Sequence, residues 1–503
     1  MARLTCLLPR ILPLCLLVGI APALLPCPAA QAEGPLYPNP LDRFGVGVLQ
    51  AFGPITNFDV GSLHIGWYLD WGVRYAPARP GGIEYAQLVW ISEGRSTVAI
   101  GDLRVIVRAN PGALWIIGNE PECVNQGNST PEQYAELYHE LYTLIKAQDP
   151  NARIAIGGVV QPTPLRLKWL DKVLEHYLTA FGRPMPVDVW NMHNMILPEV
   201  KGEWGCGIPR GLDEAEGRLY TVEDNDSLDR FVQHVLDFRL WMRDHGQRDK
   251  PLIISEYGVL MPVEYGLTAD RVNRYMNATF DYLLAARDDE LGYPADENRL
   301  AQRWLWYSLN DRPWDPASGE GYNGALFDYR DQDYPSTLTA HGQNWKRYTA
   351  SLAVCSLQGR VTLPRASETA TDLGRGVELT VTVCGRAYQV TSDRQGDFTL
   401  AGLAPGRCDV TVRAEHTLRS VQRGFVLEPG TNVVELGRLV VGDVTGDNCI
   451  DLSDLWVMAM AWTLRRQPGI DLNGDGLSNR RDVALLFGNL GRCGDVVLAT
   501  LER

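Results

Sequence analysis

The sequence predicts a multidomain protein: a (β/α)8 TIM barrel, then a small all-β sandwich, then a small α-helical calcium-binding module. Three observations predict this order. Eight short apolar runs alternate with amphipathic helical patterns between about residues 45 and 350. Short alternating strand patterns begin at Cys355, and the last 60 residues contain two acidic loops that each precede a helical pattern. A chain of 503 residues is too long for one ordinary domain.

The first residues have the pattern of a secretory signal peptide. Arg3 and Arg10 lie near the start, residues 11–25 are almost entirely apolar, and Ala30-Gln31-Ala32 supplies a small-x-small cleavage site. A retained membrane anchor is the alternative. No later stretch is long and apolar enough to span a bilayer, so we expect a secreted, extracellular protein without a membrane span in its mature chain. The C-terminal module could attach it to a cell surface.

The predicted boundaries follow from these patterns: signal peptide 1–32, barrel 33–352, sandwich 353–440, calcium-binding module 441–494 and tail 495–503. Hydrophobic residues form 45% of the chain and charged residues 21%, which excludes wholesale disorder. The formal net charge of −14 argues against a nucleic-acid partner, because such proteins usually present a basic face.

The eight apolar runs are predicted to be strands. They are apolar on both faces, which is typical of parallel strands covered by helices. The runs are residues 44–49, 66–70, 87–91, 114–118, 153–157, 187–191, 252–255 and 303–307. The clearest helix begins at Thr130-Pro131-Glu132-Gln133, a capping box with proline in the first turn. A doubly wound open sheet is the alternative, although no glycine-rich nucleotide motif follows any strand.

Residues 355–436 show short alternating strands separated by turn residues, the pattern of a small β-sandwich. Residues 357–414 resemble the carboxypeptidase-regulatory-like modules of secreted proteins. The resemblance implies a spacer or a binding domain.

Two C-terminal loops, 28 residues apart, have the ligand spacing of EF-hand calcium loops. Oxygen side chains occupy positions 1, 3, 5, 9 and 12, and position 7 offers a backbone carbonyl. These positions are Asp443, Thr445, Asp447, Cys449, Asp451 and Asp454 in the first loop and Asp471, Asn473, Asp475, Leu477, Asn479 and Asp482 in the second. Calcium prefers such clustered oxygen ligands.

The paired loops resemble a dockerin, a module that docks secreted enzymes onto cohesin domains. The resemblance implies two structural Ca2+ ions and a cohesin-bearing scaffold or surface protein as partner. The residues at positions 10 and 11 differ between the loops, Leu452-Ser453 against Arg480-Arg481, so the two loops are not interchangeable. Calcium in a purely structural role, without cohesin docking, is the alternative.

Two glutamates end predicted strands of the barrel. Glu120 follows the fourth strand in Asn119-Glu120-Pro121, and Glu256 follows the seventh in Ser255-Glu256-Tyr257-Gly258. A carboxylate directly after a buried strand is costly unless it is paired or functional. In a (β/α)8 barrel the carboxyl ends of the strands carry the catalytic groups, so both glutamates can face one cleft.

These two motifs in this order resemble the clan A glycoside hydrolases. The resemblance implies that Glu120 is the general acid/base, with a raised pKa, and that Glu256 is the nucleophile, which must stay ionised. Asn119 would bind the sugar 2-hydroxyl. It further implies substrate contacts from His193 after the sixth strand and from one of Trp306 and Tyr307 after the eighth. We also expect Tyr257 and Trp67 at the cleft, where core packing is the alternative for both.

Seven cysteines remain after residue 32, so at least one is free or intermolecular. Cys449 and Cys493 bracket the C-terminal module and could staple it. Cys123 and Cys206 both lie on loops at the predicted cleft, where a disulfide would brace the rim.

The combined prediction is a secreted retaining glycoside hydrolase that acts on polysaccharide and uses no cofactor for catalysis. A non-catalytic glycan-binding or scaffold protein is the competing hypothesis. A metal-dependent hydrolase lacks support, since the eight histidines form neither HxH nor HExxH. Structural ion pairs are the alternative for Glu120 and Glu256.

Overall fold

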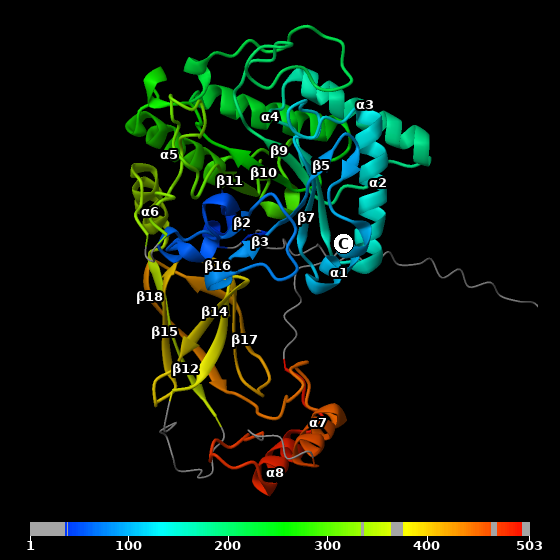
Figure 1. The fold of residues 1–503 in the computed structure, drawn as a ribbon. Coiled ribbons are helices and arrows are strands. Elements are labelled where there is room, and N and C mark those ends of the chain that lie inside the picture. Colours follow the sequence, from blue (N-terminus) through cyan, green and yellow to red (C-terminus); the bar gives the residue numbers. More distant parts are fainter. Residues whose placement is uncertain (1–35, 38, 333–335, 364–375, 464–469, 495–503) are drawn as a thin grey trace, which may run out of the picture. The chain divides into compact units, whose positions relative to one another are not determined.

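The computed structural model describes residues 36–37, 39–332, 336–363, 376–463 and 470–494 (Figure 1). The predicted signal peptide at 1–32 and the tail at 495–503 lie outside the described residues. None of the helices within the described ranges has both the length and the apolar character needed to cross a membrane.

Residues 39–352 form a unit of parallel strands and helices, which we call the α/β unit. Its parallel strands are β1 (Phe44–Gly47), β2 (Trp67–Leu69), β3 (Glu84–Tyr85), β4 (Gln87–Val89), β7 (Leu114–Asn119), β8 (Arg153–Gly158), β9 (Trp190–His193), β10 (Leu252–Tyr257) and β11 (Arg303–Trp306). A short hairpin of β5 (Ile91–Ser92) and β6 (Arg95–Ser96) follows β4.

The parallel pairs follow a circular order. One sheet runs β3-β2-β1-β11-β10-β9 and another runs β4-β7-β8. Isolated parallel bridges from Ala155 to Val189 and from Val159 to Met192 join β8 to β9. Only Ala86 separates β3 from β4. Following the pairs from strand to strand therefore leads from β1 back to β1.

The strands are buried on both faces, as their apolar runs predict. In β7, Trp115 and Ile117 belong to the large hydrophobic cluster, whereas Leu114 and Ile116 belong to a smaller one. Alternate residues of a strand point to opposite faces, so the two clusters lie on opposite sides of the sheet. This double burial holds the carboxyl ends of the strands in fixed positions.

The helices of the unit are α1 (Ile100–Ala109), α2 (Pro131–Gln148), α3 (Pro164–Phe181), α4 (Leu228–Asp244), α5 (Ala269–Ala285) and α6 (Ala340–Leu352). The predicted capping box at the start of α2 is confirmed: Thr130 accepts from the amide of Gln133, and the Gln133 side chain accepts from that of Thr130. The described segments after β1 and β2 contain short 3-10 turns instead of α-helices. Proline and glycine at Gly53-Pro54 and Pro80-Gly81-Gly82 explain this departure from eight regular units.

One strand lies later in the chain than predicted. The sixth run was expected at 187–191, but β9 begins at Trp190 and ends at His193. Val187 and Val189 instead precede the strand as buried residues, and only Val189 makes an isolated bridge. The shift places His193 within the strand itself.

The next part of the chain contains two sheets with one shared core. The first has the order β15-β12-β18 and the second β14-β13-β16-β17. The strands are β12 (Cys355–Thr362), β13 (Glu378–Val383), β14 (Arg386–Thr391), β15 (Asp397–Leu403), β16 (Gly406–Ala414), β17 (Ser420–Leu427) and β18 (Gly430–Arg438). Inward residues of both sheets form one hydrophobic cluster, for example Leu357 of β12 and Val381 of β13.

The C-terminal part contains α7 (Leu452–Thr463) and α8 (Arg480–Asn489), which begin within the two acidic loops. Ile450, Met458, Leu472 and Leu486 are buried together between these elements. Asn479 caps α8 with a capping box that includes Asp482. The loop-helix repeat predicted from the sequence is confirmed.

The cysteine pairing is confirmed in one place and wrong in another. Cys449 and Cys493 form a disulfide, as predicted, and Cys384 pairs with Cys408. Cys123 and Cys206 are both free thiols, so the predicted disulfide at the cleft rim is wrong. Their side chains lie instead in a small apolar cluster with Val160 and Met195.

We expect protein produced from residue 33 onward to carry two disulfides and three free thiols when it is denatured without reduction. Peptide mapping should recover a peptide pair linked through Cys384 and Cys408 and another linked through Cys449 and Cys493. Cys123, Cys206 and Cys355 should be alkylated. A peptide that joins Cys123 to Cys206 would contradict this pairing.

Candidate active site

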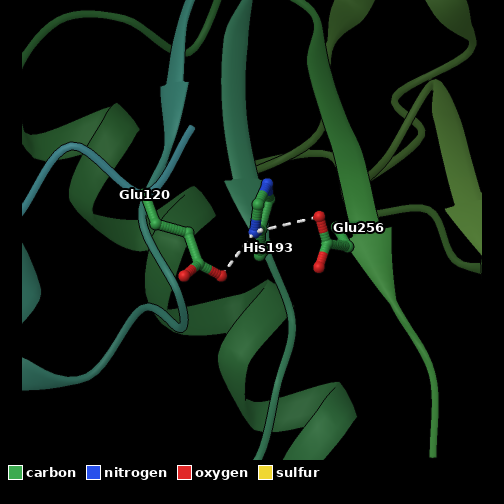
Figure 2. A group of neighbouring side chains, drawn as sticks. All are labelled: Glu120, His193 and Glu256. Carbon is green, nitrogen blue, oxygen red and sulfur yellow. Dashed lines mark hydrogen bonds and ion pairs between the residues drawn. The ribbon is translucent and has the colours of Figure 1, made fainter. Parts of the chain in front are cut away.

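Three ionisable side chains meet at the carboxyl ends of β7, β9 and β10 (Figure 2). Nδ1 of His193 lies 2.9 Å from Oε1 of Glu120 and 3.9 Å from Oε2 of Glu256. One ligand atom from each residue lies within 4.8 Å of the other two. Figure 2 shows the imidazole between the two carboxylates. In the described part of the chain, no other group of three His, Cys, Asp or Glu side chains gathers this closely.

The backbone at each strand end aims these side chains. Glu120 has a left-handed conformation, with φ +41°, directly after the last residue of β7. Its amide donates to the carbonyl of Gly158, and its carbonyl accepts from the amides of Cys123 and Gly127. The register of β10 shifts between Ile254 and Glu256, and such irregularities re-aim the next side chain. Strain of this kind is concentrated at functional sites.

The two glutamates are buried carboxylates without a Lys or Arg partner among the described residues. Each is 8% exposed, and the ion pairs of both are with His193, which is 1% exposed. Trp71 donates its Nε1 hydrogen to Oε2 of Glu256 at 3.1 Å. Structural ion pairs would neutralise these charges more completely, so the arrangement favours a functional role.

Burial and neighbouring charges set the protonation of this group. Burial raises the pKa of Glu256 to about 7; the positive charge of His193 opposes this shift and the charge of Glu120 adds to it. Burial by itself would lower the pKa of His193, but the charge of Glu256 and the hydrogen bond with Glu120 raise it. The structure thus raises the pKa of Glu256, the carboxyl group that the sequence predicted to stay ionised. Protons on such closely coupled groups belong to the cluster as a whole.

The two carboxylates open into a cavity of about 550 Å³. Part of its wall is aromatic, formed by Trp71, Trp90, Trp204, Tyr307 and Tyr322. The remainder combines amide side chains, such as Asn125 and Gln126, with apolar residues from the segments after β9 and β10. Aromatic faces and amide groups are the chemistry that proteins use to hold sugar rings.

Two of the predicted substrate contacts line this cavity. Asn119, the last residue of β7, is buried there, and its Oδ1 has no hydrogen-bond partner among the described residues. Tyr307 also lines the cavity; its ring contacts Trp71, and its hydroxyl donates to Asp311 at 2.7 Å. His193 does not line the cavity but lies against both glutamates.

Trp67 and Tyr257, which were predicted to contact substrate, are fully buried elsewhere, and so is Trp306, one of the two alternatives after the eighth strand. Trp67 belongs to the smaller cluster and donates to the carbonyl of Arg43. Tyr257 packs on Phe231 and Trp306, with its hydroxyl 3.2 Å from Oγ1 of Thr279 in α5. Trp306 donates to the carbonyl of Gly324. Tyr257 and Trp306 face the large hydrophobic cluster, whereas Trp67 lies at the start of β2, next to the residue that precedes β1.

Sequence reasoning missed most of the aromatic wall. Trp90, Trp204 and Tyr322 were not singled out. Trp204 lies in Gly202-Glu203-Trp204-Gly205, a glycine-flanked loop without strand or helix periodicity. A large aromatic residue in such a loop, half exposed here, is the signal that could have identified it. Glu122, a rival acid, is fully buried and bonds Arg166 and the amide of Val160.

The two C-terminal loops fold with the same internal hydrogen bonds. Asp443 accepts from the amides at loop positions 4 and 6, and Asp471 does the same in the second loop. Asp454 and Asp482, both fully buried, each accept from the amides at positions 2, 3 and 9. The remaining predicted ligand positions, Thr445, Asp447, Cys449, Asp451, Asn473, Asp475, Leu477 and Asn479, lie on these loops. Two loops of one shape with hard oxygen groups suit calcium chemically.

The glycosyl hydrolase catalytic core family model matches residues 50–196. The matched part contains Glu120 and His193 and ends before Glu256. No curated protein matches the chain.

Several solved structures are similar to parts of the chain. A GH128 (subgroup II) endo-beta-1,3-glucanase from Pseudomonas viridiflava is 18% identical, with a TM-score of 0.39, over 62% of this chain and 98% of that one. A GH128 (subgroup VII) oligosaccharide-binding protein from Trichoderma gamsii is 14% identical, with a TM-score of 0.36, over 63% and 97%. A type II cohesin–X-dockerin complex from Acetivibrio cellulolyticus is 19% identical, with a TM-score of 0.25, over 28% and 97%. The family-model match supports a glycoside hydrolase core in residues 50–196.

The elevated pKa of Glu256 predicts a pH-dependent cost to stability. Between its ordinary value of 4.5 and about 7, the folded protein keeps a proton that the unfolded chain loses, so wild-type stability falls as the pH rises through this window. Glu256→Gln removes the buried charge. We expect the variant to gain about 1–3 kcal/mol relative to wild type between pH 4 and pH 8.

Denaturant unfolding at pH 4, 6 and 8 measures this difference. Glu175→Gln, an exposed position on α3, is the matched control and should show no pH-dependent gain. A constant difference between Glu256→Gln and wild type across the three pH values would contradict the prediction.

Proposed function

We propose that the protein is a retaining glycoside hydrolase that acts on polysaccharide. The observation that carries the proposal is the pair of buried carboxylates, Glu120 and Glu256, whose oxygens lie within 4.8 Å at the edge of the cavity. Retaining enzymes hold their two carboxyl groups about 5–5.5 Å apart, whereas inverting enzymes need about 6.5–9.5 Å to admit a water. The short separation supports the retaining reaction.

In the proposed first step, ionised Glu256 attacks the anomeric carbon while Glu120 protonates the leaving glycosidic oxygen. A covalent glycosyl-enzyme forms and the leaving sugar departs. In the second step, Glu120 takes a proton from a water molecule, which attacks the same carbon and frees Glu256. His193 lies between the two groups and stabilises whichever carboxylate is ionised, and Trp71 orients Oε2 of Glu256 by its hydrogen bond. No step requires a cofactor.

The circular order of the parallel strands supports a (β/α)8 barrel for residues 33–352. A doubly wound sheet would reverse its strand order, while here the strands follow the order β1-β2-β3 and then β4-β7-β8-β9-β10-β11-β1, with β3 and β4 separated only by Ala86. The shared core of the next two sheets supports a carboxypeptidase-regulatory-like sandwich at 353–440. We further propose export through the signal peptide at 1–32.

Aromatic side chains in the cavity support a carbohydrate as the bound molecule, because they stack on the apolar faces of sugars. A non-catalytic glycan-binding protein would use the same wall but would not need two buried carboxylates this close together. The two hypotheses therefore differ in what Glu256 does.

We expect the wild type to release reducing sugar from at least one glycan of a panel. The panel contains β-glucans (β-1,3-glucans among them), xylans, mannans and galactans. Glu256→Gln should lower kcat by about 10⁴ or more, and Glu120→Gln by about 10²–10⁴. Glu264→Gln, an exposed position after β10, is the control and should keep full activity. Azide should restore turnover to Glu256→Ala by attacking the anomeric carbon in place of the carboxylate, which yields a glycosyl azide of inverted configuration.

If the folded wild-type protein released no reducing sugar from any glycan, the proposed hydrolase activity would be overturned. Retained glycan binding that disappears in Trp71→Ala would then identify the glycan-binding protein. A product of inverted configuration in wild type would overturn the retaining step alone.

For the C-terminal module we propose two structural calcium ions and a dockerin-like role towards a cohesin-bearing scaffold. The support is the repeated loop, in which buried Asp454 and Asp482 close matching turns. The aspartate, asparagine and threonine oxygens of the two loops, with the carbonyls of Cys449 and Leu477, would hold the ions. Calcium would stabilise the folded module by binding only to it.

We expect calcium to raise the unfolding temperature of the C-terminal module and EDTA to reverse the rise. Asp454→Asn combined with Asp482→Asn should abolish the shift, because it removes one charged ligand from each loop. Sugar release by the intact protein should be the same in calcium and EDTA. Calorimetry that detects no calcium binding to wild type would contradict the assignment.

A further inference from the structure

Arg166, in the first turn of α3, is fully buried and gives each of its donor groups to a different partner. Nε donates to Oε1 of Glu122 at 3.1 Å, and Nη1 donates to Oε1 of Glu199. Nη2 donates to the carbonyl oxygens of Cys206 and Gly207, at 2.9 and 3.3 Å. A guanidinium presents its donors in a rigid fork, so these partners are held at fixed positions around it.

One partner belongs to the loop of the candidate acid. Glu122 lies two residues after Glu120, and its Oε1 also accepts from the amide of Val160, which follows β8. Its backbone carbonyl accepts from the amide of Arg210. Oε2 of Glu122 is buried and has no hydrogen-bond partner among the described residues. Arg166 and the amide of Val160 together therefore anchor this side chain.

The other partners belong to residues 199–218, which we call the Trp204 segment. Glu199 closes its base: the amide of Gly217 donates to the Glu199 backbone carbonyl at 2.7 Å, and that of Arg218 donates to Oε2 of Glu199 at 2.8 Å. Arg166 holds the same segment near its middle, through Cys206 and Gly207. Apart from an isolated antiparallel bridge between Val200 and Glu216 at its base, the segment contains no helix or strand, so buried polar contacts hold most of its course.

Trp204 lies two residues before Cys206, is half exposed and lines the cavity together with Glu120 and Glu256. The Cys206 side chain packs against Cys123 of the Glu120 loop. The segment that carries Trp204 and the loop that carries Glu120 are thus both bonded to the buried guanidinium of Arg166. A displacement of either segment by about 1 Å would be felt in the cavity that both line.

We propose that Arg166 is a positioning residue that holds Trp204 opposite the acid loop and so sets the sugar specificity of the cleft beyond the cleavage point. This inference rests on the proposed function for its effect on hydrolysis. Its structural half, that Arg166 holds the Trp204 segment, does not depend on any substrate.

The test combines amide hydrogen exchange with a double-mutant cycle in the full chain. Arg166→Lys keeps the charge but cannot reach three divergent partners. Exchange of the amides of residues 200–217 should rise in this variant. Arg239→Lys is the matched control: Arg239 is equally buried and bonds carbonyl oxygens of Leu300, Lys250 and Arg299 away from the cavity. It should leave exchange in 200–217 unchanged.

The cycle uses oligosaccharides of increasing length from the glycan that wild type cuts. Trp204→Ala should raise KM for long oligosaccharides by about tenfold and leave short ones unaffected. In the Arg166→Lys background, Trp204→Ala should have almost no further effect, because the indole is no longer held. In the Arg239→Lys background, Trp204→Ala should raise KM for long oligosaccharides as much as it does in the wild type. A general loss of stability would leave the two effects additive.

Additive effects of Arg166→Lys and Trp204→Ala, or unchanged exchange in 200–217, would overturn the proposal. If Arg166→Lys fails to fold, Gly217→Ala is the second variant. It loosens the base of the Trp204 segment, because the added Cβ would collide with Glu199 and Leu165. It should raise exchange in the same amides, and unchanged exchange would again count against the proposal. If wild type cuts no glycan, the proposed hydrolase fails, and the exchange experiment still decides whether Arg166 holds the segment.

Discussion

Two carboxylates held around one imidazole, out of reach of any described Lys or Arg, are the constraint on which the rest of the site depends. Each charge would be costly at its depth if it stood alone. His193 can satisfy only one carboxylate fully, at 2.9 Å, and it leaves the other at 3.9 Å. Burial, together with the charge of Glu120, therefore raises the pKa of Glu256. A developing positive charge on a sugar ring is the partner that such a cluster lacks.

The packing of the strands keeps these charged groups close together. β7 and β10 carry apolar residues on both faces and β9 carries them on one, so the strand ends cannot move apart to relieve the repulsion. The left-handed backbone of Glu120 and the irregular register of β10 are local departures that such a rigid surround can sustain. Beyond the strand ends the cleft is built differently. Its outer wall follows an irregular segment whose path is set by buried ionic contacts.

The features that could be predicted from the sequence are those that the spacing of apolar residues determines. Continuous apolar runs located the parallel strands, and because parallel strands end at one edge, they also brought Glu120, His193 and Glu256 together. Proline and glycine residues explain why no α-helix follows β1 or β2. These residues could be read in the sequence, but the repeated alternation of strand and helix patterns was given more weight. Which aromatic residue faces the cavity could not be predicted, because Trp71 and Tyr307 lie just after β2 and β11, where strand periodicity no longer sets the direction of a side chain. The sequence around Trp204 could mark this residue but could not locate it in the cleft, because Arg166, which fixes its position, lies 38 residues earlier in the chain.

The disulfide between Cys449 and Cys493 has a consequence for how the C-terminal module withstands proteases. The two cysteines are 44 residues apart, and both α7 and α8 lie between them. A single cut of the backbone anywhere in that interval would leave both fragments covalently joined. The first loop, which contains Cys449, would also keep its link to the far end of α8. A nicked chain could therefore retain both loops on one molecule, and complete separation would need reduction as well as cleavage.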